Sequence, residues 1–109
     1  MAELGSDGAT GMTFDVVEGA DRTVTVALSG ELDITNVETL GSAVAPVIER
    51  EPSRLFIDAH ELRFADSSAI ALWVQWATEV PQIELRDAPA LLRRVVESMG
   101  LNEMLNLTS

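Results

Sequence analysis

The sequence contains no cysteine, no lysine, no tyrosine and only one histidine. Without cysteine, disulfides, thiolate chemistry and cysteine-type zinc sites are excluded. His60 alone leaves little material for imidazole catalysis, and we interpret it as a surface residue at a strand end. A basic-then-apolar leader and an apolar run of membrane-spanning length are also missing. We therefore expect a cytoplasmic protein that does not insert into membranes.

Positive charge is scarce as well. The chain has 18 acidic residues against 7 arginines, which gives a net charge of −11 at pH 7. Nucleic acids and anionic membrane surfaces are bound by basic patches, so this balance argues against both as partners. Electrostatic steering instead favours a protein partner with a basic face.

Motifs that carry catalysis are missing too. The chain has no GxSxG elbow and no GxGxxG or GxxxxGK[ST] phosphate loop. A serine nucleophile normally needs a nearby base, and this chain offers one imidazole and no lysine. The carboxylate pairs Glu31/Asp33 and Asp58/Glu61 arise readily by chance at this acid content. We interpret them as solvated acids in preference to acid/base catalysts or a Mg²⁺ site, and expect no enzyme activity, cofactor or metal.

What the sequence does contain is the patterning of one folded domain. The 109 residues are 47% hydrophobic, and we assign residues 12–109 to the domain and the small, acidic and glycine-rich residues 1–11 to a flexible tail. Apolar runs and period-two alternation predict strands at 14–18, 23–29, 54–59 and 83–86, with a last short strand at 104–107. Helical spacing predicts three helices, which begin near Asn36, Asp66 and Asp87.

The resulting order, ββαβαβα(β), predicts an α/β fold. An initial hairpin followed by crossover helices implies a mixed sheet with later strands parallel and three helices packed on it. Pro46 should kink the first helix or end it early, and Thr35 or Asn36 can cap its start. In the third helix Gly100 is the expected C′ residue. The buried stripe of that helix is predicted to be Leu91, Leu92, Val95 and Met99.

The most informative segment is 64–70, because it places Asp66, Ser67 and Ser68 at a helix start. A structural role alone accounts for them, since such residues cap free backbone N–H groups. A helix start also favours anions, so a phosphoryl group on serine, or a small phosphate or nucleotide ligand, is compatible with it. A phosphoserine would add up to two negative charges beside Asp66 and Asp33 and repel an acidic partner surface without refolding.

Several motifs in order resemble the STAS domain and, within it, the bacterial anti-sigma factor antagonists. They are SGELD at 29–33, LFID at 55–58, FADSS at 64–68 and the stretch from Leu-x-Arg to Met-Gly-Leu at 91–101. The resemblance covers nearly the whole chain, from about Phe14 to Leu107. It implies a mixed sheet with helices packed on it.

The resemblance also implies a function. In that family an anti-sigma factor of the serine kinase type phosphorylates the first serine of an Asp-Ser-Ser/Thr-Gly motif, and the unphosphorylated protein binds this kinase and frees the sigma factor. By position the phosphoacceptor is Ser67, and ATP belongs to the kinase. The implied partner-binding residues are Asp33, Thr35, Asn36, Asp66, Ser68 and Ala69. Trp76 joins them as a candidate anchor, because tryptophan is common at interfaces, with plain surface cover as the alternative role. We expect a monomer or a weak dimer.

Two features keep an alternative open. Ala69 stands where the motif has glycine, and no helix follows Leu107. The missing helix, together with the short link expected at 78–82 between the second helix and the next strand, also resembles the small cytoplasmic STAS subunits of lipid-trafficking ABC transporters, which bind a partner without being kinase substrates. The alternative function is therefore a non-phosphorylated STAS adaptor of such a transporter or of another signalling complex.

Overall fold

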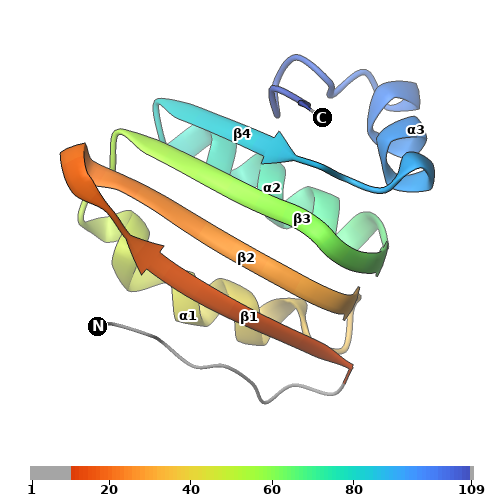
Figure 1. Cartoon of the computed structure of the whole chain (residues 1–109), viewed down its shortest axis with the longest axis horizontal. Coiled ribbons are helices and arrows are strands. Elements are labelled where there is room, and N and C mark those ends of the chain that lie inside the picture. The colour runs from red at the N-terminus through yellow and green to blue at the C-terminus, as the bar shows by residue number, and fades with distance from the viewer. Residues whose placement is uncertain (1–10, 109) are drawn as a thin grey trace.

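The computed structural model describes residues 11–108, so the expected tail over residues 1–10 lies outside the described part. The strands are β1 (Met12–Glu18), β2 (Thr23–Leu32), β3 (Arg54–Ala65) and β4 (Gln82–Arg86). The helices are the short 3-10 helix η1 (Ala20–Arg22), then α1 (Val37–Glu49), α2 (Ser67–Glu79) and α3 (Ala90–Ser98). Figure 1 shows their arrangement. Within residues 11–108 no helix is both long enough and apolar enough to cross a bilayer.

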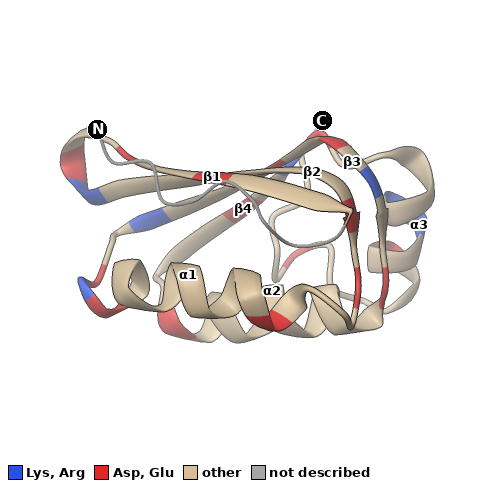
Figure 2. Cartoon of the chain, turned by 90° about the horizontal axis from the view of Figure 1, so that it is seen from below, with Lys and Arg blue, Asp and Glu red and all other residues tan. Residues whose placement is uncertain are grey.

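The strands form one sheet in the order β1-β2-β3-β4. The β1–β2 hairpin is antiparallel, whereas β2 pairs with β3 and β3 with β4 in parallel. Figure 2 shows α1 and α2 side by side on one face of the sheet, with the other face open. The predicted mixed sheet with three helices is therefore confirmed.

The core lies between the sheet and the α1–α2 layer. The period-two pattern of β2 buries Val24, Val26 and Leu28 on the helix side. Trp73 of α2 is fully buried against this face. Its indole nitrogen is the one buried side-chain polar atom without a hydrogen-bond partner among the described residues.

Two strands run further than the sequence predicts. The connection expected at 60–65 is strand, because β2 continues to Leu32 and stays paired with β3 as far as Ala65. The ladder passes two irregularities on the way, the second between Gly30 and Glu31. Gly30 has φ +92°, and a Cβ there would stand 2.1 Å from the Gly11 carbonyl oxygen, so this position requires glycine. The extension carries the ends of β2 and β3 to the same edge of the sheet.

The first helix also extends further along the chain than the sequence predicts. Pro46 was expected to kink the helix or end it early, and α1 does not end there but continues to Glu49. Val44 and Val47 on either side of the proline are buried in the core, and this packing holds the last turn together.

The prediction for α3 was half wrong. Leu92 is buried, as expected, but Leu91, Val95 and Met99 are exposed, and Val96 takes the second core position. In α3 itself only Leu92 and Val96 are buried. The apolar positions of its sequence are more numerous, so the sequence alone does not show which of them face the core.

The C-terminal segment was also mispredicted. Residues 102–106 form turns where a strand was expected at 104–107, and Thr108 makes an isolated bridge to Arg86. The cap of α3 is confirmed: Gly100 has φ +74°, its N–H donates to the Glu97 carbonyl, and the Leu101 N–H donates to Val96, which is the Schellman arrangement.

Candidate functional site

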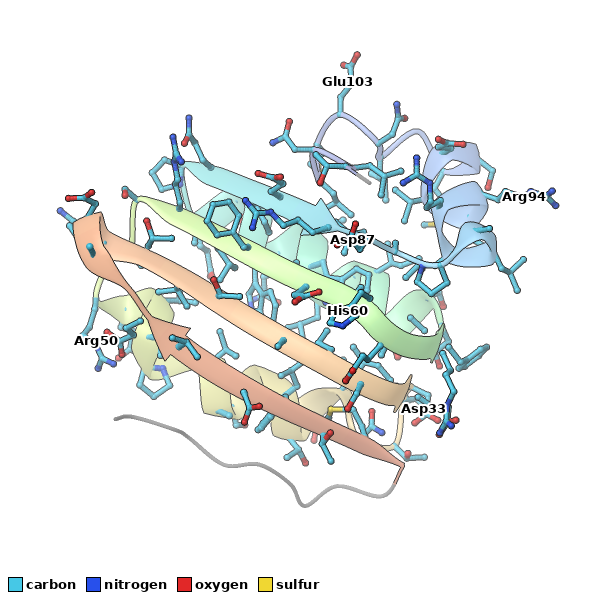
Figure 3. All side chains as sticks on the ribbon, in the orientation of Figure 1. Asp33, Arg50, His60, Asp87, Arg94 and Glu103 are labelled. Atoms are coloured by element: carbon cyan, nitrogen blue, oxygen red, sulfur yellow. The ribbon has the colours of Figure 1, made fainter. Side chains whose placement is uncertain are left out.

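The candidate site lies where β2 and β3 end beside each other. Leu32 and Ala65 are the last pair of this ladder, and the Asp66 N–H donates to the Leu32 carbonyl at 3.2 Å. The chain then enters the β2–α1 loop on one side and α2 on the other. Figure 3 shows Asp33 at this edge of the sheet. Parallel pairing thus brings together two segments that lie about thirty residues apart in the sequence, since Ile34 and Asp66 share a hydrogen bond.

Asp66 organises this edge. It is the N-cap of α2, with extended backbone (φ −99°, ψ −173°). Its Oδ1 accepts hydrogen bonds from the N–H groups of Ser68 at 3.0 Å and Ala69 at 3.3 Å, and from the Ser68 hydroxyl at 2.5 Å. Its Oδ2 accepts from the Ile34 N–H at 3.2 Å. One carboxylate therefore caps the helix and ties the β2–α1 loop to it.

The same contacts keep Asp66 ionised. Partial desolvation by itself would raise the pKa of this carboxyl above the ordinary aspartate value. The hydrogen bonds from the Ser68 hydroxyl and from the N–H groups of Ala69, Ser68 and Ile34 outweigh it, and the pKa is lowered. The edge thus carries a fixed negative charge at neutral pH.

The β2–α1 loop is held by its own side chains. Asp33 Oδ1 accepts from the Thr35 N–H at 2.9 Å and from the Thr35 hydroxyl at 2.5 Å. Asn36 was predicted as a cap, but its side chain does not cap α1. Its Oδ1 instead accepts from the Asp33 N–H, and its Nδ2 donates to the Glu31 carbonyl, each at 2.9 Å. These bonds fix the loop that presents Asp33 and Thr35.

Ser67 and Ser68 differ in availability. Ser68 is half-buried and its hydroxyl is committed to Asp66. Ser67, the first residue of α2, is exposed, and its hydroxyl forms no hydrogen bond with any residue in the described range. Of the two, Ser67 is the serine that another protein can reach.

Three residues predicted at the partner surface are buried. Asn36 is 1% exposed, Ala69 is fully buried and Trp76 is 3% exposed. Asn36 supports the loop from beneath, and Ala69 and Trp76 face the core from α2. This burial argues against direct partner contacts by Asn36 and Ala69, whereas Trp76 keeps a small accessible part that lines the groove between α1 and α2. The alanine that replaces the glycine of the motif places its methyl inside the protein, where it cannot crowd a docked partner.

The helix start is also not an open anion site. The N–H groups of Ser68 and Ala69, which a phosphate would use, already donate to Asp66. A free phosphate or nucleotide would have to displace a carboxylate and overcome its charge, so the geometry does not favour the small-ligand alternative. No three histidine, aspartate or glutamate side chains in the described part gather as metal ligands.

Sequence reasoning missed two exposed apolar side chains at this edge. Ile34 is 70% exposed, and Phe64, at the end of β3, is also exposed. Arg63 beside it pairs with Glu31 at 2.9 Å. The sequence did contain a signal for this surface, because both are large apolar residues in otherwise polar segments. They give the edge the kind of apolar contact area that protein interfaces use.

His60 takes no part in this edge. Its Nδ1 lies 2.9 Å from Asp58 Oδ1, and Figure 3 shows it on β3, on the open face of the sheet. The hydrogen bond to Asp58 and the charge of that carboxylate raise the pKa of His60.

The comparisons with known proteins agree with this geometry. A family model described as "Mlab, STAS domain" matches residues 16–107, which is most of the chain. The chain belongs to the STAS domain family. No curated protein sequence matches this STAS domain at a significant level.

Solved structures of similar fold are anti-sigma factor antagonists. One from Mycobacterium paratuberculosis superposes with a TM-score of 0.81 at 21% identity, over 89% of this chain and 85% of that one. Unphosphorylated SpoIIAA gives 0.78 at 22% identity, over 89% and 88%. Phosphorylated SpoIIAA from Bacillus gives 0.72 at 22% identity, over 89% and 91%. At these identities the likeness establishes the fold.

Proposed function

We propose that this STAS domain is an anti-sigma factor antagonist, which binds an anti-sigma factor of the serine kinase type and is switched off by phosphorylation of Ser67. The observation that carries the proposal is the exposed, uncommitted hydroxyl of Ser67 beside the fixed carboxylate of Asp66. The fold likeness to anti-sigma factor antagonists, one of them in a phosphorylated form, supports it. The site of action is then the cytoplasm.

In this proposal the kinase supplies ATP and the catalytic base. The Ser67 oxygen attacks the γ-phosphorus, its proton passes to the base of the kinase, and ADP leaves. The phosphoryl group adds negative charge next to Asp66 and near Asp33, on a protein of net charge −11. A partner with acidic side chains at this contact point then meets additional like charge and is repelled.

Modification would leave the fold intact. The cap of α2 and the tie to the β2–α1 loop both come from Asp66, and neither uses the Ser67 hydroxyl. The switch therefore acts through the electrostatics of the surface, and no rearrangement of α2 is required.

The experiment that tests the proposal is intact-mass spectrometry after incubation with ATP and each serine-kinase anti-sigma factor of the same genome. The wild type should gain one phosphoryl group, and Ser67→Ala should gain none. Ser98→Ala, which removes an exposed serine from α3, is the matched control and should be modified like the wild type. Phosphorylation of Ser67→Ala at the wild-type rate contradicts the assignment.

A second candidate is a constitutive STAS adaptor of a lipid-trafficking ABC transporter. It is favoured by the matched family, whose description does not refer to anti-sigma regulation. Under this function the same edge binds an ATPase subunit and Ser67 stays unmodified. Co-purification with a transporter ATPase, together with no phosphoryl gain in the assay above, would select it.

A further inference from the structure

A groove runs between α1 and α2 on the outer face of the helix layer, and one of its ends is lined by Ser68, the residue after Ser67. Its volume is about 630 Å³, and both helices supply its walls. Each helix has 13 residues, so the groove is at most about 20 Å long. Its small lining residues keep it open, and they are Gly41, Ser42, Ala45 and Ala71.

The floor of the groove is apolar. Ile48 and Leu72 are partly buried and line it. Trp76 also lines it with the small part of its surface that remains accessible. The indole N–H of Trp76 donates no hydrogen bond to the residues described, and it is not among the atoms sealed from solvent. An occupant of the groove would therefore meet apolar surface and one unused donor.

The rim of the groove is acidic throughout. The two helices together contain three charged residues, Glu38, Glu49 and Glu79, and all three are exposed and line the groove. No arginine lies in either helix, and Figure 2 shows acidic positions on this layer. Arg50, just after α1, is engaged by Glu18 of β1. The negative rim is thus not neutralised from within the protein.

We propose that the α1–α2 groove is a second docking site, which binds an amphipathic α-helix with basic side chains from a partner protein. The apolar stripe of such a helix would cover Ile48, Leu72 and the edge of Trp76. Its lysines or arginines would meet carboxylates on both walls. Ser68 lines one end of the groove, so a phosphoryl group on Ser67 would lie near that end. The test below uses the unmodified protein and no kinase, so its outcome does not depend on that of the proposed function.

Electrostatic repulsion argues against a second copy of this chain as the molecule that binds in the groove. If two copies met through this face, the three carboxylates of each rim would oppose those of the other. The exposed stripe of α3, with Arg94, is the other surface a copy could offer. A head-to-tail contact of that kind would join chains that each carry a net charge of −11, and their mutual repulsion opposes it.

The test uses the full chain labelled with ¹⁵N and a synthetic amphipathic helical peptide of about 14 residues, built from leucine, alanine and lysine. Amide shifts should map binding to α1 and α2, with a dissociation constant below about 1 mM. A peptide with glutamate in place of lysine should not bind. Ser42→Trp should fill the groove and abolish binding, whereas Thr39→Trp, on an exposed position of α1 outside the groove, should leave it unchanged.

Charge variants give the second readout. Replacing Glu38, Glu49 and Glu79 by glutamine should weaken the peptide about tenfold, in a salt-dependent way. The same change at three exposed glutamates elsewhere, Glu61, Glu97 and Glu103, should weaken it far less. The proposal would be overturned if Ser42→Trp bound the peptide as the wild type does, if the amide shifts lay outside the groove, or if the peptide did not bind at all. Self-association in sedimentation that Ser42→Trp abolishes would overturn it as well, in favour of a second copy.

Discussion

The edge around Asp66 and the helix α3 are organised in opposite ways. At the edge, four hydrogen bonds converge on one carboxylate, and the neighbouring Ser67 stays free and exposed. Helix α3 is held by the burial of Leu92 and Val96 and by a C-cap, and its remaining apolar side chains face solvent. Directional bonds fix the first region, and non-directional burial fixes the second. Substitutions that remove one kind of contact should therefore affect only one of the two regions.

The largest effect is expected in α3, where two adjacent leucines form a matched pair. Leu92 is 6% exposed and Leu91 is 69% exposed. Leu92→Ala should lower the free energy of unfolding by about 2–4 kcal/mol, because it leaves a cavity. Leu91→Ala should change it by less than about 0.5 kcal/mol. Urea unfolding followed by circular dichroism measures both, and equal losses would mean that the buried face of α3 is wrongly assigned.

A smaller loss is expected at the edge. Asp66→Ala removes the cap of α2 and the tie to Ile34, and should lower the free energy of unfolding by about 1–2 kcal/mol. Asp66→Asn keeps an acceptor for the helix N–H groups and should cost less. Ser67→Ala should leave stability within about 0.5 kcal/mol of the wild type. A large loss in Ser67→Ala would show that its hydroxyl is structural.

Low pH should reduce the stability that the Asp66 carboxylate gives to the fold. Since the folded pKa of Asp66 lies below its ordinary value of 3.8, the carboxylate stabilises the fold fully above that value. This contribution is lost as the pH falls through the lowered folded pKa. Chemical denaturation across this range should show a smaller acid-induced loss for Asp66→Asn than for the wild type. If the free energy of unfolding fell with pH equally in the wild type and in Asp66→Asn, the result would contradict the stabilising role of the Asp66 carboxylate.

The smallest effect is expected on the open face of the sheet. The hydrogen bond and charge of Asp58 raise the pKa of His60, so Asp58→Asn should move it back down towards 6.5. The raised value means that any stabilisation by protonated His60 is present at low pH and disappears as the pH rises through the folded pKa. An NMR titration of the imidazole resonances measures the pKa of His60. An unchanged pKa in Asp58→Asn would exclude the pairing of His60 with Asp58.

The sequence predicted what local chemistry determines. The cap at Asp66, the C′ glycine at Gly100 and the initial hairpin follow from short-range patterns, and the structure confirms them. The strand extension to Ala65 was missed, because polar residues on the open face conceal the pairing of β2 with β3.

The errors at the candidate site have a tertiary cause. The family resemblance implied that Asp33 lies beside Ser67, and the paired ends of β2 and β3 bring their two segments to one edge. The burial of Asn36, Ala69 and Trp76 depends on how α1 and α2 pack on the sheet, and residue type alone does not report it. Similarly, the core face of α3, with Leu92 and Val96, is set by how that helix packs on the common core.

The most direct test of the Ser67 switch is calorimetric titration of the anti-sigma kinase with wild type and Ser67→Glu. The account predicts binding weakened by about 1–3 kcal/mol in Ser67→Glu, from new like-charge contacts at the edge, with an unchanged melting temperature. Equal affinity of both proteins for the kinase would contradict it.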